Sequence, residues 1–177
     1  MKDLILAGTI LLVSFGCTIG QSAKIPPPDV VAHVDLNRYT GTWYEIASFP
    51  QRFQQGCRNT KAVYTLKENG TIEVLNSCFR NNGIDTAKGR AWVVDATTNA
   101  KLKVSFFWPF RGDYWIIELG KEYEYAVVGN PDRKYCWILS RTTRMDKMVY
   151  EGIVKRLQEK GFDTGKLQLM EHQGTAK

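Results

Sequence analysis

The chain of 177 residues carries 24 lysines and arginines against 18 aspartates and glutamates, a net charge of +6, and 44% of its residues are hydrophobic. This composition excludes disordered, collagen-like and multi-spanning chains and suits one globular domain with its own core. The positive balance favours contact with anionic surfaces, but it is too small to identify a partner.

The N-terminal segment predicts export from the cytoplasm. Lys2 precedes an apolar run over residues 4–15, which is shorter than the stretch needed to span a bilayer. We therefore expect residues 1–16 to be a secretory signal peptide.

The residues that follow the apolar run favour a lipid anchor. Cys17 directly after Gly16 resembles the lipobox of bacterial lipoproteins, in which the cysteine becomes the first residue and is acylated. The resemblance implies lipidation of Cys17 and, from Thr18, sorting to the outer membrane. Plain secretion with a free thiol is the alternative. Residues 17–32 contain three consecutive prolines, 26–28, and are expected to form an extended tether.

Short β-prone runs alternate with turn residues from residue 43 onward, which is typical of an antiparallel barrel or sandwich. Asn69-Gly70 indicates a tight hairpin, because these residues tolerate positive φ values. The runs cover residues 43–49, 59–66, 71–79, 89–95, 101–107, 114–119, 125–129 and 135–141. Eight strands with short loops can close around one small ligand. The predicted fold is all-β: an eight-stranded antiparallel up-and-down β-barrel over residues 33–171.

One helix is expected after the strands. Apolar residues recur there every four positions, namely Met145, Val149, Ile153 and Leu157. The helix should end at Gly161 and dock this apolar stripe on the outside of the barrel. Residues 166–170 indicate a short final strand, and 172–177 a tail.

Alternation along the strands selects the side chains that should face the interior. Counts from Trp43 and from Arg141 give the inward positions of the first and last strands, and apolar residues alternate with lysines in the fifth. The expected ligand-binding lining is Glu45, Ala47, Phe49, Tyr64, Leu102, Val104, Phe106, Tyr135, Trp137 and Leu139. Such an interior should accept a fatty acyl chain. A packed core without a cavity is the alternative.

Glu45 is the unusual member of this lining. An ionised carboxylate is costly in an apolar barrel, so we expect it to be protonated, solvated or hydrogen-bonded. It is either a polar anchor near the ligand or a satisfied buried residue. A fatty-acid headgroup is expected at the barrel mouth rather than beside it.

The cysteines after Cys17 predict one disulfide. The hairpin at residues 69–70 places Cys57 and Cys78 close together across a strand pair, where an oxidising compartment allows a disulfide. Cys136 should face outward, either as a free thiol under the helix or as an intermolecular partner, so a homodimer is one option. The sequence has no metal-binding spacing of cysteine and histidine, and we expect neither a metal nor a cofactor.

Three motifs identify a family. Gly41-Thr42-Trp43 opens the first strand, Asn130-Pro131-Asp132-Arg133 follows the seventh, and Arg141 closes the eighth. With the strings GTWYEIASFPQRF, LKVSFF, EYAVVGNPDR and YCWILSR in register, they resemble the lipocalin family. Within it, the chain is most similar to bacterial outer-membrane lipocalins, with plant temperature-induced lipocalins and apolipoprotein D as relatives.

The resemblance assigns structural roles to some residues. It implies that Gly41, Trp43, Asp132 and Arg141 maintain the fold, with the Arg141 guanidinium over the Trp43 indole. Similarity to apolipoprotein D also indicates that Asn76 and Cys78 face inward, which adds Asn76 to the ligand-binding lining.

The family resemblance implies a membrane-anchored, non-enzymatic carrier of fatty acids or lysophospholipids that serves in envelope maintenance or stress. A carrier of another hydrophobe, such as a sterol, pigment or haem-like compound, is the alternative. A lipid-modifying enzyme is less favoured, because the only histidines, His33 and His172, lie outside the predicted strands. The export signal and the motifs disfavour a nucleic-acid partner. Basic side chains near the helix suggest attraction to anionic headgroups, with a solvated face as the alternative.

Overall fold

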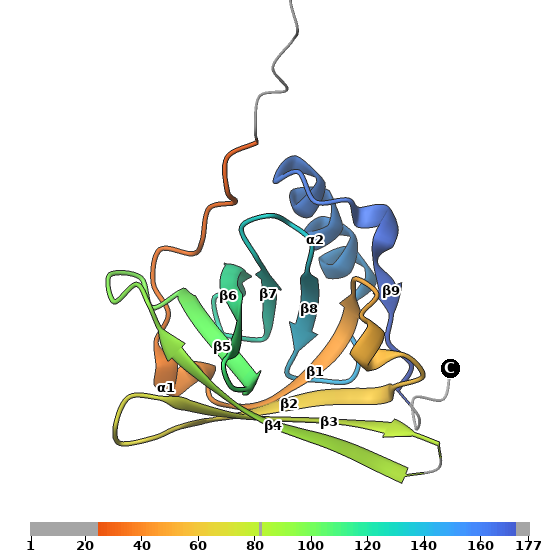
Figure 1. Ribbon diagram of the computed structural model, residues 1–177. Coiled ribbons are helices and arrows are strands. Elements are labelled where there is room, and N and C mark those ends of the chain that lie inside the picture. Colours follow the sequence, from red (N-terminus) through yellow and green to blue (C-terminus); the bar gives the residue numbers. More distant parts are fainter. Residues whose placement is uncertain (1–24, 82, 173–177) are drawn as a thin grey trace, which may run out of the picture.

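The computed structural model describes residues 25–81 and 83–172, so the predicted signal peptide 1–16, Cys17 and the residues after 172 lie outside the described residues. Within these ranges, one antiparallel sheet closes on itself in the order β2-β3-β4-β5-β6-β7-β8-β1-β9, with an additional β2–β1 pairing (Figure 1). The strands are β1 (Gly41–Ser48), β2 (Arg58–Leu66), β3 (Ile72–Arg80), β4 (Gly83–Val93), β5 (Lys101–Phe107), β6 (Phe110–Leu119), β7 (Tyr125–Gly129), β8 (Cys136–Ser140) and β9 (Gln168–Leu169). The predicted barrel is confirmed.

Two strands are longer than their sequence patterns indicated. β4 begins at Gly83 rather than residue 89, and β6 begins at Phe110 rather than residue 114. Both extensions belong to long hairpins whose side chains are mostly exposed, so no apolar alternation marks them in the sequence. The final strand is shorter than predicted, and it pairs only with Ala47 and Ser48 of β1.

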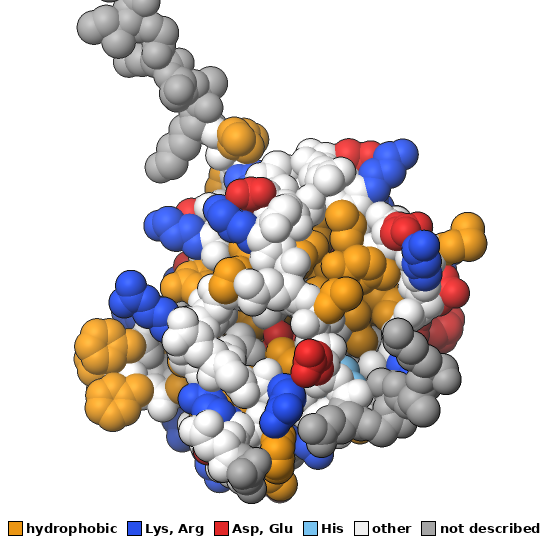
Figure 2. All heavy atoms as spheres, turned by 90° about the vertical axis from the view of Figure 1, so that its right-hand side faces the viewer, with side chains coloured by type: hydrophobic (Ala, Val, Ile, Leu, Met, Phe, Trp, Pro, Cys, Tyr) orange, Lys and Arg blue, Asp and Glu red, His pale blue; other side chains and the backbone are white. Residues whose placement is uncertain are grey.

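The helix α2 (Lys147–Glu159) packs on the outside of the barrel, as predicted, but Val149 of the expected apolar stripe is 39% exposed and Met145 precedes the helix. Asp146 caps it by accepting hydrogen bonds from the main-chain N–H groups of the second and third helical residues. Ile153 and Leu157 are fully buried in a cluster with Ile138 and Cys136 of β8. Figure 2 shows this side of the molecule, with a broad hydrophobic area bordered by charged side chains. No helix in the described ranges has the length and hydropathy to cross a bilayer.

The cysteines lie where the pairing argument expected them. Cys57 and Cys78 form a disulfide with their Cα atoms 5.4 Å apart. Cys136 is a free thiol buried under α2, and desolvation raises its pKa to about 12. Its thiol is therefore protonated at neutral pH, and it packs with Ile153 and Leu157 of the helix.

A β-bulge in β1 reverses part of the predicted lining. Glu45 lies opposite Leu139, but Ala47 lies opposite Ile138, so one extra residue is inserted between them. The insertion turns Ala47 and Phe49 to the outer face, where both belong to the cluster beneath α2. The predicted inward orientation of Ala47 and Phe49 is therefore wrong.

Arg141 and Trp43 close one end of the barrel. The Arg141 guanidinium lies 3.7 Å from the centroid of the Trp43 ring, and Trp43 is completely buried. The same guanidinium donates hydrogen bonds to four main-chain oxygens, those of residues 38, 40, 42 and 123. Gly41 adopts a φ of +91°, and an added Cβ there would stand 3.5 Å from Arg141.

Three further short elements complete the described chain. α1 (Leu36–Tyr39) lies beside the closed end and buries Tyr39, and η1 (Arg52–Gln54) and η2 (Thr164–Lys166) are single 3-10 turns. In the β7–β8 turn, Asp132 accepts hydrogen bonds from Asn130 Nδ2 and from the Lys134 main chain. These bonds hold the turn that returns the chain into β8.

Candidate ligand-binding site

The barrel interior divides into a closed half and an open half. Large side chains fill the closed half and are buried, namely Tyr39, Trp43, Tyr64, Ile72, Val74, Leu102, Ile116 and Leu139. In the open half, the inward positions carry smaller residues, namely Asn76, Ala87, Gly89 and Gly112. Along β4, inward residues change from buried at Ala91 to exposed at Ala87. The interior therefore opens to solvent in this half.

Gly112 marks unfilled space in the open half. It lies opposite Val104, whose side chain packs against the barrel core, so both positions face inward. A Cβ added at Gly112 would meet no atom within 4 Å. The space beside this exposed position on the inward face is therefore open.

A cavity of about 730 Å³ lies beside the open half. Its walls come from η1, from the start of β2 and from β9 with the residues after it, and Glu45 and Ser48 of β1 contribute to its lining. β2 pairs with residues 41–44 of β1, whereas β9 pairs with Ala47 and Ser48 further along the same strand. The cavity occupies the space where these two strands separate, and its volume is in the range of small-molecule sites.

Glu45 is the polar centre of this region. Its side chain is only 3% exposed, and Glu45 Oε2 accepts a hydrogen bond of 2.7 Å from Gln54 Nε2. Gln54 Oε1 in turn accepts from the Trp137 indole N–H at 3.4 Å. Glu45 Oε1 has no hydrogen-bond partner among the described residues. Burial raises the pKa of Glu45, so the carboxyl is easier to protonate and to use as a donor.

Three tyrosine hydroxyls form a polar layer within the core of the closed half. Tyr114 Oη lies 2.7 Å from Tyr39 Oη and 3.0 Å from Tyr64 Oη. Burial raises the pKa of each, that of Tyr64 to about 12, so all three are neutral. The three hydroxyl groups have three hydrogens, but they form only two hydrogen bonds with one another. One O–H can therefore donate to a further oxygen.

The remaining predicted residues occupy different depths. Leu102, Leu139 and Tyr64 belong to the packed closed half, and Val104 lies at its boundary. Trp137 is partly buried and stacks on Tyr135, with 5.9 Å between ring centroids. Tyr135 is 41% exposed, so this aromatic pair extends from the interior to the surface.

Asn76 and Phe106 belong to the open half. Asn76 lies opposite Ala62 and Ala87, as expected of an inward residue. Phe106 is 42% exposed, and its ring lies 2.7 Å from the place where a Cβ of Gly89 would stand. It also borders a groove on the outer face, so it stands at the edge between interior and surface.

The sequence analysis missed several residues of the site, namely Ser48, Gln54, Ala87 and Gly112. Ala87 and Gly112 lie in strand extensions that carry no alternation signal. Gln54 reaches Glu45 from a turn, which no strand count can anticipate. Among the described residues, no group of three His, Cys, Asp or Glu is arranged to hold a metal ion. The barrel interior is apolar, whereas the adjoining cavity is lined mostly by polar and charged side chains, and this combination suits binding of an amphipathic molecule.

Comparison with known proteins agrees with this geometry. The model of the Lipocalin-like domain matches residues 34–172. The chain is 38% identical to the outer membrane lipoprotein Blc of Escherichia coli (strain K12), over 99% of each chain. It is 42% identical to temperature-induced lipocalin-1 of Arabidopsis thaliana, over 78% of this chain and 80% of that protein.

The fold also matches a solved structure. Insecticyanin from the tobacco hornworm Manduca sexta aligns with a TM-score of 0.71 at 22% identity, over 86% of this chain and 88% of that chain. At this identity the alignment shows a shared fold. The family of the sequence relatives is one of carrier proteins rather than enzymes. The chain belongs to the lipocalin family.

Proposed function

We propose that this chain binds fatty acids or lysophospholipids in the open half of its barrel and serves in envelope maintenance or stress. The unfilled inward face at Gly112 is the observation that carries the proposal. An acyl chain gains about 0.8 kcal/mol for each methylene buried in such a space. The polar headgroup is placed at the mouth, where Tyr135 and Trp137 are partly exposed.

The proposal includes an outer-membrane lipid anchor. Residues 1–16 are the signal peptide, Cys17 is acylated, and residues 17–32 tether the barrel of residues 33–171. The relative named outer membrane lipoprotein Blc, which matches over 99% of this chain, supports this assignment. Replacing Cys17 with Ala should move the protein from the membrane fraction to the soluble fraction. Continued membrane retention of Cys17→Ala would contradict the anchor.

The ligand class is tested on protein purified from its own membranes. Native mass spectrometry should detect a bound fatty acid or lysophospholipid that leaves on delipidation. The delipidated protein should then bind an acyl-chain probe and change the probe's fluorescence. A sterol, pigment or haem-like mass in the native spectrum would instead identify another hydrophobe. No bound mass together with no probe response would refute the lipid proposal.

A cavity-filling variant locates the ligand. Gly112→Leu introduces roughly four carbon atoms into the space an acyl chain would occupy, so affinity for the acyl probe should fall at least about ten-fold. Thr86→Leu is the matched control, because Thr86 lies opposite Ser77 on the outer face and is exposed. Both variants should keep the parent's unfolding midpoint. Unchanged probe affinity in folded Gly112→Leu would place the ligand elsewhere.

A further inference from the structure

The turn that joins β5 and β6 exposes three aromatic side chains. Phe107, Trp108 and Phe110 are 74%, 74% and 71% exposed. Phe107 and Phe110 lie opposite each other across the hairpin, with their rings stacked at 6.3 Å between centroids. Scattered apolar residues are normal on a surface, but three adjoining aromatic rings indicate an interaction site. We call residues 107–110 the aromatic tip.

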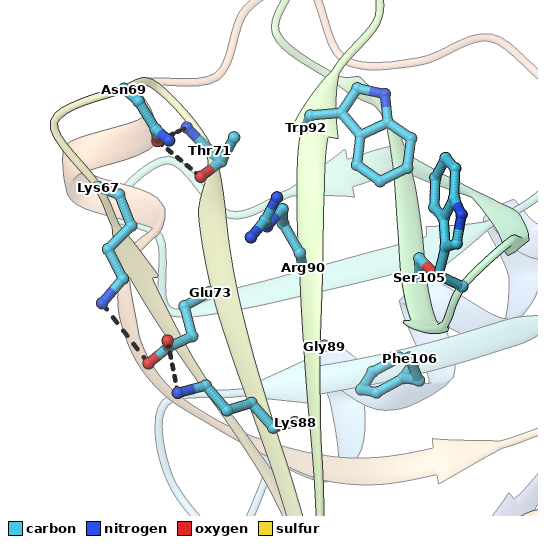
Figure 3. A pocket seen from close by; sticks show the side chains of 11 residues that line it. Lys67, Asn69, Thr71, Glu73, Lys88, Gly89, Arg90, Trp92, Ser105 and Phe106 are labelled. Carbon is cyan, nitrogen blue, oxygen red and sulfur yellow. Dashed lines mark hydrogen bonds and ion pairs between the residues drawn. The ribbon is translucent and has the colours of Figure 1, made fainter.

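A basic groove adjoins the aromatic tip. It has a volume of about 710 Å³ on the outer face of β3, β4 and β5, and Trp108 forms part of its wall. Arg90 and Trp92 line it from β4, on the face opposite the buried Ala91. Figure 3 shows Lys67 and Lys88 both directed at Glu73, whereas no contact is drawn to Arg90.

The ion pairs around the aromatic tip leave two cations uncompensated. Glu73 forms ion pairs with Lys67 at 3.6 Å and with Lys88 at 2.9 Å. Asp113 forms an ion pair with Lys103 at 2.6 Å. Neither Arg90 nor Arg111 has an ion-pair partner among residues 25–81 and 83–172. The surface beside the exposed rings therefore carries positive charge that is free to meet an anion.

We propose that the aromatic tip and the basic groove dock on a bilayer that contains anionic phospholipids. Aromatic rings favour the interfacial region of a membrane, since they bury apolar area while the indole N–H stays near water. Arginine presents paired donors to phosphate oxygens, so Arg90 and Arg111 bind the headgroups beside the inserted rings. This contact does not depend on acylation of Cys17.

Docking in this way brings the open half of the barrel to the membrane. Inward residues of β5 become more exposed towards the aromatic tip, from 2% at Leu102 to 42% at Phe106. The aromatic tip therefore projects from the same end as the open half. If the proposed lipid ligand is correct, it enters from the bilayer without crossing bulk water; the docking itself stands without that ligand.

The first test places Trp108 in the membrane. The full-length chain with Cys17→Ala is mixed with vesicles of phosphatidylcholine and phosphatidylglycerol whose acyl chains carry bromine near the headgroup. Tryptophan fluorescence should be quenched, and Trp108→Phe should remove that quenching while keeping the same vesicle affinity. Quenching that persists in Trp108→Phe would overturn the proposal.

The second test compares vesicle affinity by co-sedimentation. Phe107→Ser with Phe110→Ser should weaken binding at least about ten-fold. Met148→Ser, at a side chain 81% exposed on α2, is the control and should change binding by less than about two-fold. Because these side chains are exposed, all variants should unfold at the parent's midpoint. Equal vesicle affinity of the parent and of the Phe107→Ser, Phe110→Ser variant would refute insertion of the aromatic tip into the bilayer.

The third test addresses charge and the competing surfaces. Arg90→Gln and Arg111→Gln should each weaken binding about five-fold, and only when phosphatidylglycerol is present. Lys155→Gln on α2 is the matched control, and an equal loss there would make the helix the docking face instead. Sedimentation velocity of the parent and of the Phe107→Ser, Phe110→Ser variant tests the alternative that the aromatic tip binds a second copy of the chain. Lost self-association with unchanged vesicle binding would mean that the aromatic tip contacts a second copy of the chain.

Discussion

Replacing Arg141 with methionine should destabilise the barrel strongly without changing its interior. The guanidinium donates to the main-chain oxygens of residues 38, 40, 42 and 123 at distances of 2.6, 2.9, 3.0 and 3.2 Å. Because Arg141 is partly exposed, water will replace some of these bonds, and each is worth about 1 kcal/mol. The contact with Trp43 adds about 1 kcal/mol. The expected loss is roughly 3–5 kcal/mol, a large part of a typical domain's stability.

Urea unfolding of the parent and the variants measures this loss. Arg141→Lys keeps the charge over Trp43 but cannot reach four acceptors at once, so its stability should lie between those of the parent and Arg141→Met. Arg111→Met is the control for removing an arginine, since Arg111 is exposed and has no ion-pair partner in the described part of the chain. A loss below about 1 kcal/mol for Arg141→Met would refute the reasoning that these hydrogen bonds hold the closed end.

Two further predictions concern the buried carboxyl and the disulfide. Burial raises the pKa of Glu45 in the folded state, so folding is penalised above the pKa of the unfolded chain and the penalty disappears as the pH falls below it. Glu45→Gln should therefore be more stable than the parent at neutral pH and equally stable in acid. Urea unfolding midpoints measured across this pH range check the prediction. A parent that is more stable than the variant at pH 7 would contradict it. Replacing both Cys57 and Cys78 with Ser removes a link across a sequence separation of 21 residues and should cost about 3 kcal/mol, which reduction of the parent should reproduce. Equal stability of the oxidised and reduced parent would exclude that role.

The sequence predicted those features that depend on short-range patterns. Eight alternating runs became the eight barrel strands, and the four-residue repeat ending at Leu157 became the helix that covers β8. The Asn69-Gly70 turn predicted that Cys57 and Cys78 lie close together, because a tight hairpin sets the register of both its strands to within a residue or so of the observed pairing.

The sequence predicted the ligand site only in part. Counting by twos along β1 placed Ala47 and Phe49 inside, whereas the bulge before Ala47 turned them under α2. No local signal marks this bulge, since Ile46 and Ala47 are both apolar and either could face the interior. Its position depends on how β1 pairs with β8 and on the helix that covers its outer face.

Local sequence determined that this chain forms a barrel and where the core of each strand lies, and the family motifs indicated which residues close one end. Only the tertiary structure decided where the barrel opens. A glycine at position 112 reads the same in any strand, and only the folded chain shows that the space beside it is open. A void is a property of several walls at once, so no single segment encodes it.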